Sequence, residues 1–526
     1  MLYNFQTRKG GESMLRLITT MTFFISLAYA QTSKIVWMNY QAAKGCVTCH
    51  RIASVKMNDT LYIFGTFHYN NNKMNPFLIA VDGSLNIKWF KAFSHNLPNL
   101  DITAIHKVND SLILVSGGHA IRSDECSFQN CNFFGLFNVK NQSFIWSKSF
   151  SENQTYGAFM DIAQISTNSF ILIAHRDDYA NNSVIVKIDL NGNVEYQKLI
   201  SVGNYNYCTS LSSINDTLFI SCILHDGTFQ SRIIAVDTLG NAIFSKKFNF
   251  GFYFVPYRIF RTSDGFLVVG LDWFSSHHIF IYKVDFNGNF MWAKRYESSL
   301  GSSRAYNIAQ DWDGNYLISG YIRVNSTTSY PLVMKIDNNG NLIWARAWQT
   351  TPSNTPSNFG KGVISIGKGK FYLLTFIGKG LDASGGFAII REDTNPNLVG
   401  HCTEPINLTV NSFTPTIVDE TSKITDANYT LSNLQLTPYD PTINQTNSCE
   451  ITPVSNYEFY KSCFFEIRAN KGYIDIKLKE KNNVIVYDII GNVVYSEFFE
   501  GERNVKVKNG IYVIKVGKEK VKMVVR

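Results

Sequence analysis

A phrase of about sixteen residues recurs along most of this chain: an apolar strand, a turn, and a second strand with an aromatic residue near its centre. Clear copies are Ile185–Ile200, Ile281–Tyr296 and Val333–Trp348, and looser ones are Ile79–Phe93, Phe137–Phe150 and Ile234–Phe248. The central aromatics lie 48 to 57 residues apart and are Trp37, Trp89, Trp146, Tyr196, Phe244, Trp292 and Trp344. A repeat of this length made only of short strands is typical of a β-propeller, with one four-stranded blade per repeat.

An earlier hairpin precedes each of these phrases, and its turn is usually Asn-Asp or Asp-Gly, as at Asn58-Asp59 and Asp313-Gly314. Such turns supply the positive φ that tight hairpins need. Hairpins and aromatic strands are out of phase, because Lys34–Tyr40 precedes the first hairpin and Phe387–Glu392 has no aromatic strand after it. The sequence therefore predicts an all-β, seven-bladed propeller over residues 31–402, in which the N-terminal strand completes the last blade and removes its open edge.

The repeated phrases resemble the Asp-x-x-Gly-x-x-x-Trp pattern of quinoprotein-type and related surface propellers. The residue types also explain themselves physically. Asp and Gly favour the turn, and the aromatic ring packs between neighbouring blades. We therefore interpret these residues as scaffold rather than as ligands.

The N-terminus has the pattern of a secretory signal peptide over residues 1–30, and we interpret Met14 as the true start. Arg16 supplies the positive charge, Leu17–Leu27 the apolar stretch, and Ala28-Tyr29-Ala30 the small residues before cleavage. No later segment is apolar for the roughly 18 residues that a membrane helix needs. The net charge of +8 is spread along the chain without a basic helix, so nucleic-acid binding is not expected. The mature chain is expected to be exported without a transmembrane segment.

Nine cysteines in an exported chain are expected to be mostly paired. Cys126 and Cys131 flank a short loop, and Cys208 and Cys222 lie symmetrically about the turn at Asn215-Asp216. Cys402 and Cys449 bracket a polar segment rich in Thr, Asn and Pro. We interpret residues 403–453 as a linker or insert closed by that disulfide, and Cys463 is left over.

Cys46, Cys49 and His50 form a complete Cys-x-x-Cys-His, the attachment pattern of c-type haem. The repeat alignment places this motif on a loop just before the innermost strand of a blade, with no helix to enclose a porphyrin. Haem needs a dry pocket and a shaped axial site. A small loop disulfide is therefore favoured, with c-type haem, metal binding and free thiols as alternatives, and no cofactor is expected.

After Cys449 the repeat gives way to short alternating strands over residues 454–526, which predict a small Ig-like β-sandwich. The Tyr-Asp-x-x-Gly at Tyr487, Asp488 and Gly491, the Gly-x-Tyr at Gly510 and Tyr512, and the lysine-flanked last strand resemble the type A C-terminal sorting domain of the type IX secretion system. Asn509 stands where that family commonly has Pro or Ser. The resemblance implies a Bacteroidota-like host, export by way of the periplasm, and release or anchoring at the cell surface, with the secretion machinery as partner.

The sequence shows no nucleophile elbow, phosphate loop or paired-carboxylate motif. We therefore expect a secreted or surface-displayed protein that binds an unknown ligand, rather than an enzyme. The alternatives are a redox protein carrying c-type haem or quinone, and a polysaccharide-acting enzyme. Two weaker candidates are Phe250–Tyr257, interpreted as packing rather than sugar stacking, and the pair His277-His278, which lacks further metal ligands at useful spacing.

Overall fold

The computed structural model describes residues 34–39, 53–69, 73–94, 100–118, 132–151, 156–177, 182–201, 206–225, 227, 229–273, 277–324, 328–348, 357–378, 386–392, 403–420, 423–427, 430–439, 444–448, 458–461, 465–470, 473–488, 492–508, 510–516 and 519–525. These residues contain strands and turns but no helix, so none of them forms a helix that could cross a membrane. The chain divides into two compact units, Met1–Leu398 with Thr403–Ser448, and Val399–Cys402 with Cys449–Arg526. The all-β prediction is confirmed.

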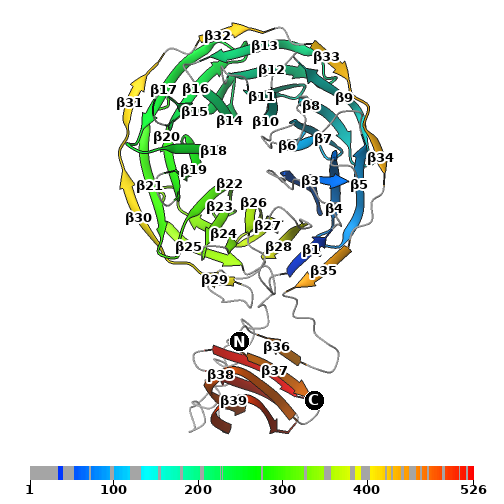
Figure 1. Ribbon diagram of the computed structural model, residues 1–526, viewed down its shortest axis with the longest axis vertical. Coiled ribbons are helices and arrows are strands. Elements are labelled where there is room, and N and C mark those ends of the chain that lie inside the picture. The colour runs from blue at the N-terminus through cyan, green and yellow to red at the C-terminus, as the bar shows by residue number, and fades with distance from the viewer. Residues whose placement is uncertain are drawn as a thin grey trace, which may run out of the picture. The chain divides into compact units, whose positions relative to one another are not determined.

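Antiparallel groups of four strands, here called blades, make up most of the first unit and are arranged as a ring in Figure 1. In chain order they are β2 (Ala53–Met57), β3 (Thr60–Tyr69), β4 (Lys73–Val81) and β5 (Ile87–Ser94); β6 (Asp101–Lys107), β7 (Leu112–Gly118), β8 (Asn132–Asn138) and β9 (Ser143–Ser151); β10 (Tyr156–Ser166), β11 (Ser169–Asp177), β12 (Ser183–Asp189) and β13 (Val194–Ser201); β14 (Asn206–Ile214), β15 (Thr217–His225), β16 (Phe229–Asp237) and β17 (Ala242–Asn249); β18 (Phe254–Arg261), β19 (Phe266–Asp272), β20 (His278–Val284) and β21 (Phe290–Ser298); β22 (Ser303–Gln310), β23 (Tyr316–Arg323), β24 (Ser329–Ile336) and β25 (Leu342–Trp348); and β26 (Ser357–Gly367), β27 (Lys370–Gly378) and β28 (Gly386–Glu392) with β1 (Lys34–Asn39). Small antiparallel sheets in a ring are the architecture of a β-propeller.

Two backbone pairings join segments that are distant in the chain or belong to different blades. β1 pairs antiparallel with β28, with Trp37 opposite Ala388, so a strand from near the N-terminus shares a sheet with β26–β28. The single pair Ala158 and Gly118 links the β10–β13 blade to the β6–β9 blade, and these two blades therefore count as parts of one larger sheet.

Five of the described turns that precede an aromatic strand share one set of hydrogen bonds. In Asp285–Asn289, the Asp285 carboxylate accepts the backbone N–H groups of Asn287 and Asn289 at 2.8 and 2.7 Å, and Gly288 has φ 72°. Equivalent bonds hold the turns that begin at Asp82, Asp189, Asp237 and Asp337. A positive φ strains residues with a side chain, which explains the glycine in four of these five turns. In the turn that begins at Asp82 the residue is Leu85, whose side chain is fully buried.

The aromatic of one blade covers the turn glycine of the next. A Cβ atom on Gly340 would lie 2.6 Å from the Trp292 ring, and one on Gly192 would lie 2.8 Å from Trp146. The indole N–H of Trp292 donates to Asn338 O at 3.2 Å. Tyr196 and Phe244 cover Gly240 and Gly288 in the same way. The interpretation of the aromatic as an inter-blade packing residue is confirmed at these positions.

The interpretation of residues 403–453 as a polar linker is wrong for Thr403–Ser448. This segment forms seven described strands, each paired antiparallel with the outermost strand of a blade (Figure 1). They are β29 (Thr403–Pro405) on β25, β30 (Leu408–Phe413) on β21, β31 (Thr416–Asp419) on β17, β32 (Lys423–Asp426) on β13, β33 (Thr430–Asn433) on β9, β34 (Thr437–Tyr439) on β5 and β35 (Asn444–Ser448) on β1. We call Thr403–Ser448 the belt. Its polar composition suits strands that lie on an exposed outer edge and take their stability from backbone pairing.

Apolar residues spaced along the belt pack into the cores of the blades. Phe413 packs against Phe252 and Phe280, with ring centroids 5.4 and 5.7 Å away. Leu434 is buried, and its backbone N–H donates to Ser147 O at 2.9 Å. Ile406 and Leu431 also join the cores of the blades that they cover.

One of the expected disulfides falls within the described residues. Cys208 and Cys222 are opposite each other on β14 and β15 and form a disulfide, which confirms that prediction. Cys126, Cys131, Cys402, Cys449 and Cys463 lie outside the described residues, as does the signal peptide over residues 1–30.

The second unit is a small sheet with its own core. Its strands are β36 (Glu458–Lys461), β37 (Phe465–Asn470), β38 (Tyr473–Asp488), β39 (Val493–Lys506), β40 (Gly510–Val516) and β41 (Glu519–Val525). β38 and β39 are longer than the short strands that the sequence predicts. Their ladder continues through a register shift between Leu478 and Asn482. The six strands form one hydrogen-bonded sheet around a cluster that includes Ile476, Val486 and Ile514.

Candidate functional site

The innermost strands of the first unit share an irregularity that turns side chains toward the centre of the ring. In six of them the pairing with the next strand skips one residue, which is the mark of a β-bulge. The skipped residues are Thr103 on β6, Met160 on β10, Thr209 on β14, Tyr257 on β18, Tyr306 on β22 and Lys361 on β26. A bulge re-aims its side chain, and all six of these residues line one cavity.

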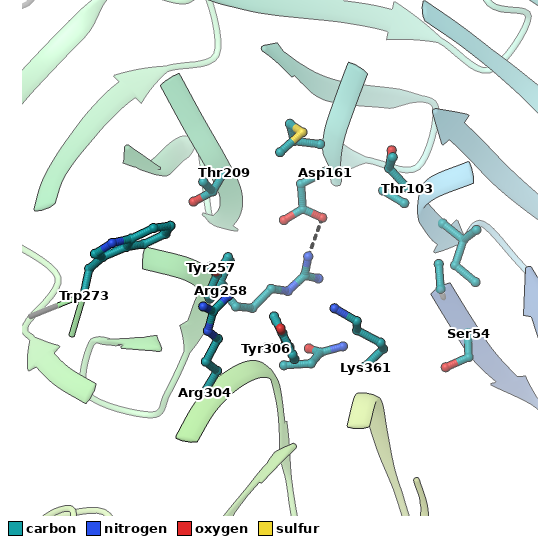
Figure 2. A pocket seen from close by; sticks show the side chains of 15 residues that line it. Ser54, Thr103, Asp161, Thr209, Tyr257, Arg258, Trp273, Arg304, Tyr306 and Lys361 are labelled. Carbon is teal, nitrogen blue, oxygen red and sulfur yellow. Dashed lines mark ion pairs between the residues drawn. The ribbon is translucent and has the colours of Figure 1, made fainter. Parts of the chain in front are cut away.

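This cavity has a volume of about 440 Å³ and receives side chains from the innermost strand of every described blade. Ala53 and Ser54 of β2 complete the ring of contributions. Figure 2 shows Ser54 and Thr103 across the cavity from Arg304 and Trp273. The volume lies within the range of about 300–1,000 Å³ that is usual for small-ligand sites.

Asp161 is the one carboxylate among the described residues that line the cavity, and its oxygens are occupied. The Arg258 guanidinium lies 2.8 Å from Asp161 Oδ1 (Figure 2). Ser210 Oγ donates to Oδ2 at 2.6 Å, and the Leu211 N–H donates to the same oxygen at 3.0 Å. Asp161 is 3% exposed, whereas the Arg258 side chain is 37% exposed. The Asp161 carboxylate therefore holds Arg258 at the cavity wall. It does not face the cavity as a free acid or base.

Arg304 and Lys361 both lie against aromatic rings. The Lys361 ammonium lies 3.6 Å from the Tyr306 ring centroid. The Arg304 guanidinium lies 5.6 Å from the Trp273 ring centroid. Within the described part of the chain, the buried Nε–H of Arg304 has no hydrogen-bond acceptor. Burial raises the pKa of Tyr306, so this phenol stays neutral. The wall thus combines positive charge with aromatic faces.

His106 follows Ile105 on β6, the strand from which Thr103 and Ile105 line the cavity. Its Nε2 is 3.2 Å from Gln164 Oε1. Burial is the largest cause of the lowered pKa of His106. The hydrogen bond with Gln164 and the charge of Asp161 raise this pKa in part, whereas the charge of Arg258 lowers it. The ring is therefore neutral at neutral pH.

The residues singled out from the sequence do not form this site. Cys46, Cys49 and His50 lie outside the described residues. His277 packs against Trp273, with ring centroids 5.3 Å apart, and no cluster of three His, Cys, Asp or Glu among the described residues could hold a metal ion. Phe250 and Phe254 are buried in an inter-blade core, so the packing interpretation of Phe250–Tyr257 is confirmed for them, whereas Tyr257 lines the cavity.

The sorting-motif residues belong to the second unit, and Gly491 lies outside the described residues. The Asp488 carboxylate accepts the N–H of Asn492 at 2.8 Å, the same type of bond as in the turns between blade strands. Gly510 begins β40, and the Tyr512 hydroxyl donates to Lys508 O at 2.8 Å. Tyr487 lies on β38 opposite Val513.

The sequence interpretation missed Asp161, Arg258, Arg304, Tyr306 and Lys361. A usable signal exists, because the bulged residues recur at spacings of 48 to 57 residues, like the aromatics. The bulged residues are two Thr, two Tyr, one Met and one Lys. Because no single residue type marks the position in every repeat, a search for repeated phrases does not find it.

Comparisons with known proteins support no further assignment. No protein-family model matches the chain, and no curated protein matches it. The phage phi92 endosialidase matches with 8% identity and a TM-score of 0.37, covering 69% of this chain and 70% of that one. A europium-containing methanol dehydrogenase gives 10% identity and a TM-score of 0.39, covering 68% and 93%. A Synechocystis apocarotenoid oxygenase gives 10% identity and a TM-score of 0.34, covering 72% and 96%. These proteins differ in function from one another.

Proposed function

We propose that this protein is an exported β-propeller that binds a small ligand in its central cavity. The observation that carries the proposal is the convergence of bulged side chains from successive innermost strands on one cavity of about 440 Å³. Bulges disrupt the ladder locally, and they are over-represented next to functional sites. Binding is favoured over catalysis because the Asp161 carboxylate is already committed to Arg258, Ser210 and Leu211.

A cavity-filling variant tests this part of the proposal. Ser54 lies across the cavity from Arg304 and Trp273, so Ser54→Trp is expected to fill the space from the side opposite Arg304. Wild-type protein and this variant are compared on an array of glycans and small metabolites. A ligand that binds wild-type protein and is lost in Ser54→Trp supports the proposal. Unchanged binding in the variant would place the ligand elsewhere and overturn it.

We further propose that the blades number seven and that the N-terminal strand closes the ring. The pairing of β1 with β28 on one side and with β35 on the other supports this arrangement. Deletion of Gln31–Tyr40 is expected to expose the edge of β28 and to cause aggregation. An experimental structure with six or eight blades, or a stable monomer after the deletion, would contradict it.

The export route is proposed from the resemblance of residues 454–526 to type IX sorting domains. Support comes from the compact second unit, whose core is its own and whose last strand β41 pairs along β40. Removal of Lys518–Arg526 deletes all of β41. The shortened protein should reach the periplasm by its signal peptide and stop there. Fractionation of the native host measures this, and full-length levels outside the cell would refute the route.

The alternative functions remain open to direct tests. A redox protein with c-type haem at Cys46, Cys49 and His50 would show a haem absorbance spectrum after expression with cytochrome-maturation machinery. A polysaccharide-acting enzyme would release reducing ends from glycans. No observation in the described residues favours either.

A further inference from the structure

The wall of the central cavity carries an excess of positive charge. Arg258, Arg304 and Lys361 line it from β18, β22 and β26, and Asp161 is the one carboxylate in the described lining. Among the described residues, the lining therefore holds three cationic side chains and one carboxylate, a net charge of +2. Cationic side chains gathered in a concave site focus the field on a ligand of opposite sign.

The geometry prepares these cations to bind an oxyanion. Arg258 is held by Asp161 at 2.8 Å, while 37% of its side chain stays exposed. Arg304 presents a buried Nε–H with no acceptor within the described residues. A buried donor left without an acceptor is costly, and an oxygen of a bound ligand would remove that cost. Guanidinium groups match carboxylate and sulfate oxygens in pairs.

Aromatic rings flank the cations. The Tyr257 and Tyr306 rings lie 5.2 Å apart between centroids, and Trp273 is 48% exposed beside Arg304. Flat apolar faces next to polar groups suit a ring that carries hydroxyl groups, because one face can pack while the edges form hydrogen bonds. The Asn307 side chain adds an amide to the same wall.

We propose that the cavity binds an acidic sugar, whose carboxylate or sulfate is held by Arg258, Arg304 and Lys361 and whose ring packs on Tyr306 and Trp273. This inference rests on the proposed binding function and specifies its ligand. Since the attraction is electrostatic, the affinity falls as the salt concentration rises.

The test is calorimetric titration of the full-length mature protein with three probes: glucuronate, glucose 6-sulfate and glucose. The two acidic sugars are expected to bind, and glucose at least tenfold more weakly. The acid that binds better identifies the carboxylate or the sulfate as the preferred oxyanion. Equal binding of glucose would overturn the inference while leaving the proposed function intact, provided that Ser54→Trp abolishes binding. Binding of the acids that Ser54→Trp does not affect would overturn both. If no probe binds, the inference fails, and the array decides the proposed function independently.

Matched variants locate the interaction. Arg304→Gln and Lys361→Gln are each expected to weaken binding of the acidic probes at least tenfold and to reduce its salt dependence. Arg261→Gln is the control, since Arg261 is an exposed arginine at the other end of β18 and does not line the cavity. Thermal unfolding shows whether each variant is folded. Folded Arg304→Gln and Lys361→Gln proteins that bind the acids as wild type does would overturn the inference.

Discussion

At the scale of single residues, the turn glycines separate two physical effects. Gly340 and Gly314 both have positive φ, at 73° and 83°. A Cβ on Gly340 would lie 2.6 Å from the Trp292 ring, whereas a Cβ on Gly314 would have no atom within 4 Å. Backbone strain therefore applies to both positions, and steric conflict with the neighbouring blade applies to Gly340.

Gly314→Ala should cost about 1–2 kcal/mol for its left-handed backbone. Gly340→Ala should cost about 1–3 kcal/mol more, because the added carbon overpacks the interface with Trp292. Denaturant unfolding measures both, and Trp292→Leu should offset part of the Gly340→Ala loss. Equal losses of stability in Gly314→Ala and Gly340→Ala would show that packing of Trp292 does not require a glycine at position 340.

The lowered pKa of His106 predicts how the free energy of unfolding depends on pH. Burial lowers its pKa in the folded protein, so the unfolded chain takes up the proton at a higher pH than the folded chain. The free energy of unfolding should therefore fall as the pH drops below about 6.5, the ordinary histidine value, toward the lowered one. Thermal unfolding between pH 7.5 and 5 measures this. His106→Gln, which keeps a polar group near Gln164, should flatten the decline; part of it remains, because burial also lowers the pKa of His277. Parallel curves for both proteins would contradict the assignment.

At the scale of elements, the belt holds its blades by backbone pairing and by a few ion pairs of unequal strength. Glu420 contacts Arg232, which is 1% exposed, and lies 2.9 Å from Lys247. Asp426 lies 2.8 Å from Lys198 but is 84% exposed. Charge removal beside a buried cation is far more costly than the loss of a surface pair.

Glu420→Gln should therefore destabilise the protein by about 3 kcal/mol, the lower end for a buried pair, because 22% of the Glu420 side chain is exposed. Asp426→Asn, the matched variant on the same belt, should cost at most about 1 kcal/mol. Both values come from denaturant unfolding at low salt. A loss for Asp426→Asn as large as that for Glu420→Gln would mean that burial does not set the strength of these pairs.

The same scale shows where sequence reasoning succeeds. Strand phrases, Asp-Gly turns and the Cys208–Cys222 pairing depend on residues close in the chain, so they can be predicted from the local sequence. β30 and β35 pair with strands more than one hundred residues away. Nothing local in a segment rich in Thr and Asn distinguishes an edge strand from a linker. The cavity was missed for a related reason, since bulges such as the one at Tyr306 are defined by pairing rather than by residue type.

At the scale of the whole molecule, the belt visits the blades in nearly the reverse of their order in the chain. It pairs first with β25 and continues through β21, β17, β13, β9 and β5. It ends on β1, the strand that also pairs with β28. A belt with this path can pair fully only after every blade has formed, so the stability of the ring and the seating of the belt are coupled.

This coupling leads to different expectations for two truncations. A chain that ends at Ser448 keeps the belt and loses the second unit, whose core is separate. It should stay monomeric and unfold near the full-length melting temperature.

A chain that ends at Cys402 loses the belt and exposes the outer strand of each described blade. Unpaired edges invite association, so this chain should aggregate or melt well below the first. Size-exclusion chromatography and thermal unfolding measure both outcomes, with Cys402→Ser in each chain to exclude effects of an unpaired thiol. Addition of a peptide spanning Thr403–Ser448 should restore the monomer by strand addition. If the chain ending at Cys402 is monomeric and melts at the same temperature as the chain ending at Ser448, the belt does not contribute to the stability of the ring.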